Sequence, residues 1–358
     1  MRFGRLLSLA LLLSWQLARG EPLKYEFLLL PSAEGAGTFD RTVPDTQIHA
    51  AVVQADVLLT LQQGPLKLFS EYLLSNHEGD LERLQLGWQL SDDTVIWLGR
   101  FHEPGSVWNH DHHHGQYLQT SITRPAIEEW EDLGGVLPQH FTGVLVESGA
   151  DVLNGRRLRM ALAGGIAPQI TEEGLEAFDL IHPDTDSRHQ LGFQGRLSLH
   201  PNEFSESGAG LLLADDELTT VGLIEPAAAT LDHVHLRLYG LFATYAHADW
   251  KVTATIYAAD GRMYYTTHRH EDSFSVGYIQ GEYRFAYDLT GFARWEDSIG
   301  AASSEYLKLF DRFARARQVA GLRWDFAHRQ ALTVQFARTH TLEGQYSDIR
   351  LQWSAAFF

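Results

Sequence analysis

The sequence Ile349-Arg350-Leu351-Gln352-Trp353-Ser354-Ala355-Ala356-Phe357-Phe358 alternates between apolar and polar residues. Successive side chains of an extended chain point to opposite sides, so each side of this stretch has its own character. The apolar side carries Ile349, Leu351, Trp353, Ala355 and Phe357. The polar side carries Arg350, Gln352 and Ser354. The pattern predicts a β-strand with one apolar and one polar face.

The same alternation recurs along nearly the whole chain that precedes this strand. In one example, Leu332, Val334 and Phe336 alternate with Thr333, Gln335 and Ala337. Candidate strands cover residues 24–31, 46–62, 66–75, 81–91, 93–102, 115–123, 141–148, 156–166, 188–200, 207–214, 232–246, 249–258, 272–284, 285–296, 317–327, 330–340 and 345–357. An even number of strands lets an antiparallel barrel close, so we expect about 16 within a range of roughly 14–18.

These segments predict an all-β fold, a transmembrane antiparallel β-barrel. A soluble antiparallel sandwich or propeller would also alternate and stays open as an alternative. Three features favour the barrel. The polar faces carry many arginines that a water-filled lumen would hydrate. Trp and Tyr cluster near strand ends, as in interfacial belts, and the sequence stops within a strand.

The closing residues resemble the last strand of Gram-negative outer-membrane proteins, whose aromatic C-terminus is read by the barrel-assembly machinery. One departure is that Phe357 is in phase with the apolar face and Phe358 lies one residue beyond it. Residues 320–326, 331–336 and 351–354 together resemble the last three strands of porin-like proteins, which include relatives of the phosphate-selective porins.

This resemblance covers about the last 45 residues well. It implies a location in the bacterial outer membrane, contact with outer-membrane lipids, and a water-filled pore for passive passage of small solutes. Trimers are usual among porins of this size, so the resemblance also suggests a homotrimer.

The N-terminus has the layout of a secretory signal peptide. Arg2 and Arg5 precede an apolar run at residues 6–13, and Ala18-Arg19-Gly20 supplies small residues for cleavage. We therefore expect a signal peptide at residues 1–20 and one barrel domain at residues 21–358. No later run of apolar residues is long enough for a transmembrane helix. The formal net charge of −18 argues against nucleic acid as a partner, and the absence of cysteine excludes disulfides.

The most unusual segment lies between Gly99 and Gly143 and joins two early predicted strands. Its Trp108-Asn109, His113-His114-Gly115 and Arg124-Pro125 are similar to pairs and triplets that recur in this order in uncharacterised porin-like proteins. In porins, an early loop commonly folds into the lumen and narrows it. We therefore expect part of residues 103–140 to form a constriction.

Histidines concentrate in this segment and are candidate metal ligands: His102, His110, His112, His113 and His114. Imidazole suits zinc, copper or nickel, and Asp111 or Glu103 could complete a site. On an extended chain only His110, His112 and His114 would share a face. A solvated or hydrogen-bonded loop, or a pH-sensitive constriction, would explain the same residues. No cofactor is required by the barrel itself.

Charged side chains on the predicted inner faces are candidates for lining the pore. They are Arg83, Arg100, Arg124, Arg159, Arg196, Arg237, Glu282, Arg284, Arg323 and Asp325. Such charges sort ions in a lumen, or pair with one another and stiffen the wall. Residues 297–316 carry Tyr306, Leu307, Phe310, Phe313 and Ala314 at helical spacing, which predicts a short loop helix packed on the barrel rim or acting as a lid.

No enzyme motif is present: the sequence lacks a Gly-x-Ser-x-Gly elbow, a His-Glu-x-x-His pair and a phosphate-binding glycine loop. We therefore do not expect an enzyme. Two functional hypotheses remain. The first is a porin-like channel for passive diffusion of small hydrophilic solutes or ions. The second is a barrel that binds a divalent metal through its histidine-rich loop, for uptake or sequestration.

Overall fold

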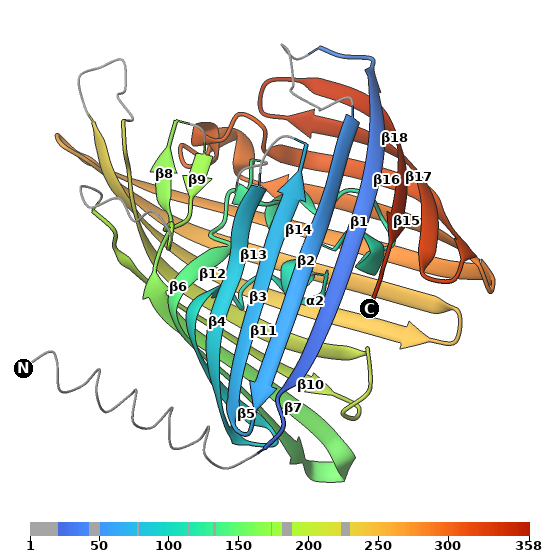
Figure 1. Ribbon diagram of the computed structural model, residues 1–358. Coiled ribbons are helices and arrows are strands. Elements are labelled where there is room, and N and C mark those ends of the chain that lie inside the picture. The colour runs from blue at the N-terminus through green and yellow to red at the C-terminus, as the bar shows by residue number, and fades with distance from the viewer. Residues whose placement is uncertain are drawn as a thin grey trace, which may run out of the picture.

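The computed structural model describes residues 21–42, 51–76, 79–112, 115–131, 134–172, 174–180, 188–222 and 230–358. Sixteen strands of these residues form one closed barrel, and every neighbouring pair is antiparallel (Figure 1). The predicted fold class and the expected number of strands are therefore confirmed. The predicted signal peptide at residues 1–20 lies outside the described residues.

The first half of the barrel wall consists of β1 (Lys24–Phe39), β2 (Ala51–Gln63), β3 (Leu66–Ser75), β4 (Gly79–Ser91), β5 (Thr94–His102), β6 (His140–Val152), β7 (Arg156–Ile166) and β10 (Leu191–His200). The second half consists of β11 (Gly208–Thr219), β12 (Leu231–His247), β13 (Trp250–Tyr265), β14 (Arg269–Ala286), β15 (Leu289–Ile299), β16 (Ala314–Ala327), β17 (Gln330–Thr341) and β18 (Gln345–Ala355). A separate hairpin is formed by β8 (Gln169–Thr171) and β9 (Gly174–Glu176).

The first and last strands close the barrel. β1 pairs with β18 from Ser32 opposite Ser354 to Phe39 opposite Ser347, so the blue strand β1 and the dark red strand β18 lie side by side in Figure 1. At one end, called here the short-turn end, brief turns such as residues 248–249 and 328–329 join the strands. The longest connections, among them residues 103–139, lie at the opposite end, called here the long-loop end. Closure removes the exposed strand edges that an open sheet would present.

The burial of the two strand faces is the reverse of that in a soluble protein. On β17, the polar Thr333 and Gln335 are 2% and 0% exposed, whereas Val334 and Phe336 are 40% and 44% exposed. The other strands likewise turn large apolar side chains outward. A sandwich would bury its apolar faces between sheets. The outer apolar band is the surface that a bilayer covers in barrels of this architecture.

Within the described part of the chain, no helix is both long and apolar enough to cross a membrane.

One predicted strand is wrong. Residues 115–123 contain the 3-10 turn η1 (Gln116–Leu118) and no strand, because they belong to the connection between β5 and β6 that leaves the wall. The Thr120 hydroxyl, the Ile122 backbone nitrogen and the Gln119 carbonyl oxygen bond to side chains on three different strands, so the segment has no regular strand partner.

The interior is less hydrated than the alternation of the sequence suggests. At the long-loop end, most inward side chains of β11–β14 are apolar and join one core cluster, with the buried Asp216 of β11 as an exception. The cluster includes Leu212, Leu236, Leu238, Tyr257 and Phe274. It packs against Val107, Trp108, Ile127, Val136 and Leu137 of the β5–β6 connection. One side of the lumen is therefore filled by a packed core.

The loop between β15 and β16 also joins this core. It contains two single 3-10 turns, η5 (Ala301–Ser303) and η6 (Leu307–Leu309), in place of the predicted amphipathic helix. Tyr306, Leu307, Phe310 and Phe313 are nevertheless buried in the cluster. The Tyr306 hydroxyl donates a hydrogen bond to the carbonyl oxygen of Val136 at 2.5 Å. The apolar spacing thus predicted correctly that these side chains are buried, but it wrongly predicted an amphipathic helix.

Candidate functional site: a segment across the barrel

The connection between β5 and β6, residues 103–139, is called here the inner segment. It contains α2 (Val107–His112), η1 and η2 (Ala126–Glu128). β15 lies eight strands away from β5 in the sixteen-stranded barrel, on the opposite wall. The backbone nitrogen of Ala126 donates to Glu296 of β15 at 2.6 Å, and Arg294 of β15 donates to the carbonyl oxygen of Thr123 at 2.9 Å. The inner segment therefore reaches from β5 to the far wall and returns to β6.

A buried charge network on β15 and β16 holds the far end of the inner segment. The Nε atoms of Arg294 and Arg317 each lie 2.8 Å from Oε1 of Glu296. Arg294 also donates to the carbonyl oxygen of Arg124 at 2.8 Å and to the hydroxyl of Ser121 at 2.9 Å. Buried charges are tolerated when they are paired and hydrogen-bonded, as all three strand residues are here.

Glu128 fastens the middle of the inner segment to β13 and β14. Its Oε1 accepts hydrogen bonds from the hydroxyls of Tyr257 at 2.8 Å and Tyr278 at 3.0 Å. Its Oε2 accepts from the Ser106 hydroxyl and the Trp108 backbone nitrogen, each at 2.6 Å. Burial raises the pKa of Glu128, while these four donors oppose that shift.

Two further wall residues hold the part of the inner segment nearest β16 and β17. Arg323 donates to the carbonyl oxygens of Tyr117 at 2.8 Å and Gln119 at 2.7 Å. Oε1 of Gln335 accepts from the backbone nitrogen of Ile122 at 2.9 Å. The backbone of the inner segment has no neighbouring strand to bond with. Inward side chains of the wall bond to its buried N–H and C=O groups instead.

The two described histidines of the inner segment, His110 and His112, do not share a face. His110 and His112 lie on the helix α2, where residues two apart face different directions. The predicted shared face, which assumed an extended chain, is therefore wrong for this pair. Burial and the nearby charges of Lys251 and Arg124 lower the pKa of His112 to about 3, so it stays neutral at physiological pH. His113 and His114 lie outside the described residues.

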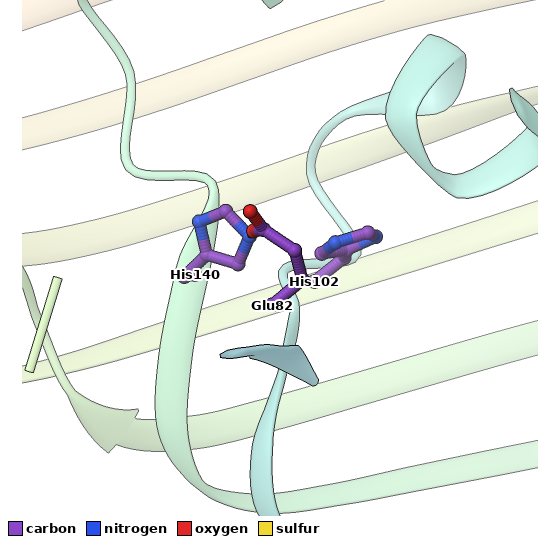
Figure 2. Close-up of side chains that lie close together, drawn as sticks. All are labelled: Glu82, His102 and His140. Atoms are coloured by element: carbon purple, nitrogen blue, oxygen red, sulfur yellow. The ribbon is translucent and has the colours of Figure 1, made fainter. Parts of the chain in front are cut away.

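Acidic and imidazole side chains gather on five neighbouring strands of the other wall, β2 to β6. Asp56 of β2, Glu71 of β3, Glu82 of β4, His102 of β5 and His140 of β6 are all buried. His102 is the one candidate metal ligand of the sequence analysis that belongs to this group. Figure 2 shows the Glu82 carboxylate beside the His140 ring, with the His102 ring on its other side.

A β-bulge explains why both Glu82 and Arg83 point inward. Glu71 pairs with Arg83 and Tyr72 pairs with Leu81, which leaves Glu82 without an opposite residue. Such an extra residue disrupts the strict alternation of faces and bends the strand. The inward Arg83 then binds Glu71, with Nε and Oε2 2.5 Å apart. Alternation alone would have placed Glu82 on the outer face.

Solved structures of outer-membrane porins are similar to this barrel throughout its length. An anion-selective porin from Comamonas acidovorans matches with a TM-score of 0.60 and 10% identity, covering 94% of this chain and 100% of that one. OmpF of Salmonella typhi, in complex with daunomycin, matches with a TM-score of 0.58 and 13% identity over 93% and 98% of the two chains. The outer-membrane channel DcaP of Acinetobacter baumannii matches with a TM-score of 0.57 and 10% identity, covering 94% of this chain and 98% of that one. The chain has a porin fold.

No protein-family model and no curated protein matches the sequence. The porin fold therefore rests on strand number, closure and the path of the backbone.

Most of the predicted pore residues face the lumen of this porin fold. The inward positions are those of Arg83, Arg159, Arg196, Glu282, Arg284, Arg323 and Asp325 on strands, and Arg124 on the inner segment. Arg100 is buried but pairs across the sheet with Leu84, which is exposed on the outer face. Arg100 lies 3.2 Å from Asp80, Glu282 accepts from the hydroxyl of Thr120 at 2.6 Å, and Arg323 lies 2.9 Å from Asp325. Their part in permeation stays a prediction.

The prediction that Arg237 lines the pore is wrong, because Arg237 lies on the outer face. Its neighbours Leu236 and Leu238 point inward to the apolar core, and its Nε lies 3.1 Å from Asp215 of β11. At the long-loop end, β12 turns polar side chains outward and apolar ones inward. A strand that extends beyond the bilayer has a hydrated outer face, so polarity no longer identifies the lumen there.

Three residues that hold the inner segment were not predicted from the sequence: Arg294, Glu296 and Arg317. They lie on the polar face of the predicted strands at 285–296 and 317–327, so alternation could have found them. His140, Glu128 and Glu82 were not predicted either. Nothing local in the sequence distinguishes these three from other polar residues, since their partners lie on distant parts of the chain.

Proposed function

We propose that this protein is an outer-membrane channel for passive diffusion of small hydrophilic solutes or ions, and that the inner segment forms its constriction. The observation that carries the proposal is the attachment of the inner segment to both walls of a closed barrel. The outer apolar band supports a position in the bilayer. The porin fold shared with known channels supports the same conclusion.

The short-turn half of the lumen supports passage of hydrated solutes. Its inward residues include Arg159, Arg196, Lys251 and Arg284, none of which is buried. These four cations lie between the short-turn end and the apolar core that packs around the inner segment. Rings of basic side chains favour anions in pores. We infer that small anions pass more readily than cations.

Assembly and export follow from the same proposal. The signal peptide would direct export, the C-terminal strand would be read by the barrel-assembly machinery, and outer-membrane lipids would surround the apolar band. One solved structure with TM-score 0.56 is the trimer form of OmpT of Vibrio cholerae. This likeness supports a homotrimer as the proposed assembly.

Conductance of the pure, folded protein in a planar lipid bilayer tests the proposed function. We expect stepwise currents in potassium chloride. A variant in which residues 115–131 are replaced by a short Gly/Ser linker should give larger steps, because it removes the crossing part of the inner segment. Absence of ion current from folded wild-type protein and from the linker variant would refute the channel. Equal step sizes would refute the constriction while leaving the channel intact.

A further inference from the structure

Three buried side chains on adjacent strands bring potential metal-ligand atoms together. Glu82, His102 and His140 each offer one such atom, and these atoms all lie within 4.8 Å of one another. Their side chains come from β4, β5 and β6 and converge on one point (Figure 2). The three residues are 4%, 7% and 5% exposed, so water competes little for them.

We propose that Glu82, His102 and His140 bind a divalent transition-metal ion, with zinc as the ion they suit best. Two imidazoles and one carboxylate form a ligand set that zinc accepts, and the remaining coordination position would take another carboxylate or water. This site is distinct from the histidines of α2. It does not depend on the channel activity proposed above.

The first supporting feature is an outer shell around His140. Nδ1 of His140 lies 2.8 Å from Oε2 of Glu131, and Nε2 lies 3.0 Å from Oε2 of Glu82. Metal-binding histidines usually give their other ring nitrogen to a carboxylate, which fixes the ring and makes it a better ligand. Glu131 occupies that position, so Nε2 of His140 is directed toward the carboxylate of Glu82.

The indole of Trp130 holds both rings in place. Its centroid lies 5.4 Å from that of His140 in a stacked arrangement, and 5.1 Å from that of His102. The two imidazole centroids are 4.9 Å apart. Packing that restricts the rotation of both rings before an ion binds lowers the entropic cost of binding.

The surrounding charge also favours a cation. Four carboxylates lie in this region, those of Asp56, Glu71, Glu82 and Glu131, and three guanidinium groups, those of Arg83, Arg100 and Arg124, act on the group. Oε2 of Glu82 lies 3.0 Å from Nε2 of His140, and Oε2 of Glu71 lies 4.0 Å from Nε2 of His102. A cation held between these carboxylates would be paired, which lowers the cost of burying it.

Glu71 is the candidate for a fourth ligand. Its Oε2 lies 4.0 Å from Nε2 of His102. Its Oε1, and both carboxylate oxygens of Asp56, are buried and accept no hydrogen bond from the described residues. Buried acceptors without donors are uncommon in folded proteins, and an ion or the water bound to it would satisfy them.

Calorimetric titration of zinc chloride into the full-length, folded, chelator-treated protein tests the site. We expect one ion per chain. Glu82→Gln and His102→Gln should abolish saturable binding, and Glu131→Gln should weaken it by roughly 10–100-fold. His235→Gln, on the outer face of β12, is the matched control and should bind as the wild type does. The double variant His110→Gln/His112→Gln should also bind normally.

Visible absorption of the cobalt(II)-loaded wild type gives a measurement that needs no variant to fold. Nitrogen and carboxylate ligation in four- or five-coordinate geometry should give intense d–d bands, and zinc should displace them. Absence of zinc uptake by folded wild-type protein would show that the three side chains form only an ion pair and would overturn the proposal. Uptake that survives Glu82→Gln/His102→Gln would overturn it as well. Neither result bears on bilayer conductance, so the two proposals fail separately.

Discussion

The hydroxyl of Tyr257, on β13, donates a hydrogen bond of 2.8 Å to Oε1 of Glu128, on the inner segment. These residues are 129 positions apart in the sequence. Both are fully buried. The bond joins the barrel wall to the segment that crosses it, so the position of the segment depends on a carboxylate that two elements share.

Replacing Glu128 should loosen the inner segment. Glu128→Ala removes the acceptor of four hydrogen bonds. The buried donors of Ser106 and Tyr278 lose their bond at about 1–3 kcal/mol for each donor, while the Tyr257 hydroxyl keeps only the carbonyl oxygen of Gly105 at 3.3 Å. We expect larger and noisier single-channel currents than in the wild type. Tyr257→Phe is the control, since it removes one donor and leaves Tyr278 bound, and its effect should be smaller. Equal currents in all three proteins would contradict this role of Glu128.

Arg294 should contribute strongly to stability. Its side chain is fully buried against Glu296 and the inner segment, and breaking a buried pair costs about 3–5 kcal/mol. Arg294→Gln should lower the free energy of unfolding by about that amount, measured by denaturant titration in micelles. The exposed pair of Arg269 and Glu271, 2.8 Å apart, gives the comparison. Arg269→Gln should change stability by about 0–1 kcal/mol, and a similar loss in both variants would argue against the buried network.

The two faces of β2 should differ in their tolerance of a new charge. Val57 lies on the outward face near the middle of the strand, and Thr60 lies on the inward face beside Glu26 of β1. Val57→Arg should destabilise the barrel by about 2–4 kcal/mol, because the charge would enter hydrocarbon. Thr60→Arg should be nearly neutral. Unfolding in lipid vesicles measures both, and the reverse order would mean that the faces are assigned wrongly.

Glu103 should make the packing of the inner segment depend on pH. Burial, reinforced by the nearby carboxylate of Asp216, raises the pKa of Glu103 well above its ordinary value. A carboxyl whose pKa is raised on folding stabilises most below its unfolded pKa, and that contribution is lost as the pH rises through the folded pKa. Glu103→Gln should therefore match the wild type near about pH 4 and exceed it in stability near about pH 8.

Denaturant midpoints at the two pH values measure this difference. Gln keeps an oxygen that accepts the bond from the backbone nitrogen of Gly105, so the contact itself survives the change. Glu203→Gln, at an exposed turn, should show no such difference. A Glu103→Gln variant that is less stable than the wild type at the higher pH would show that the charged form is the favoured one.

The basic residues of the short-turn half should set ion preference. Arg159, Arg196 and Arg284 face the lumen there and are not buried. Reversal potentials in a salt gradient should show anion preference in the wild type, and the three substitutions to Gln together should move the permeability ratio toward unity. Arg237→Gln, on the outer face, should leave the ratio unchanged. An equal shift from Arg237→Gln would contradict the assignment of the faces.

The sequence by itself determined the barrel, its approximate strand number and the facing of most side chains. Alternation is a local property of an extended chain, so Val334 and Gln335 identify their faces without knowledge of their neighbours. Alternation gave the wrong face where a strand leaves the apolar band or loses its regular pairing. Arg237 lies beyond the apolar band, and the bulge at Glu82 shifts one residue to the other face.

Tertiary structure alone decided how the interior is filled. The inner segment has no regular period, and its partners Tyr257, Arg294 and Gln335 lie more than 100 residues away in the chain. The convergence of Glu82, His102 and His140 likewise depends on the register of three strands and on the return of the chain to β6. Local pattern fixes which way a strand faces, but closure of the barrel determines what each inward side chain meets.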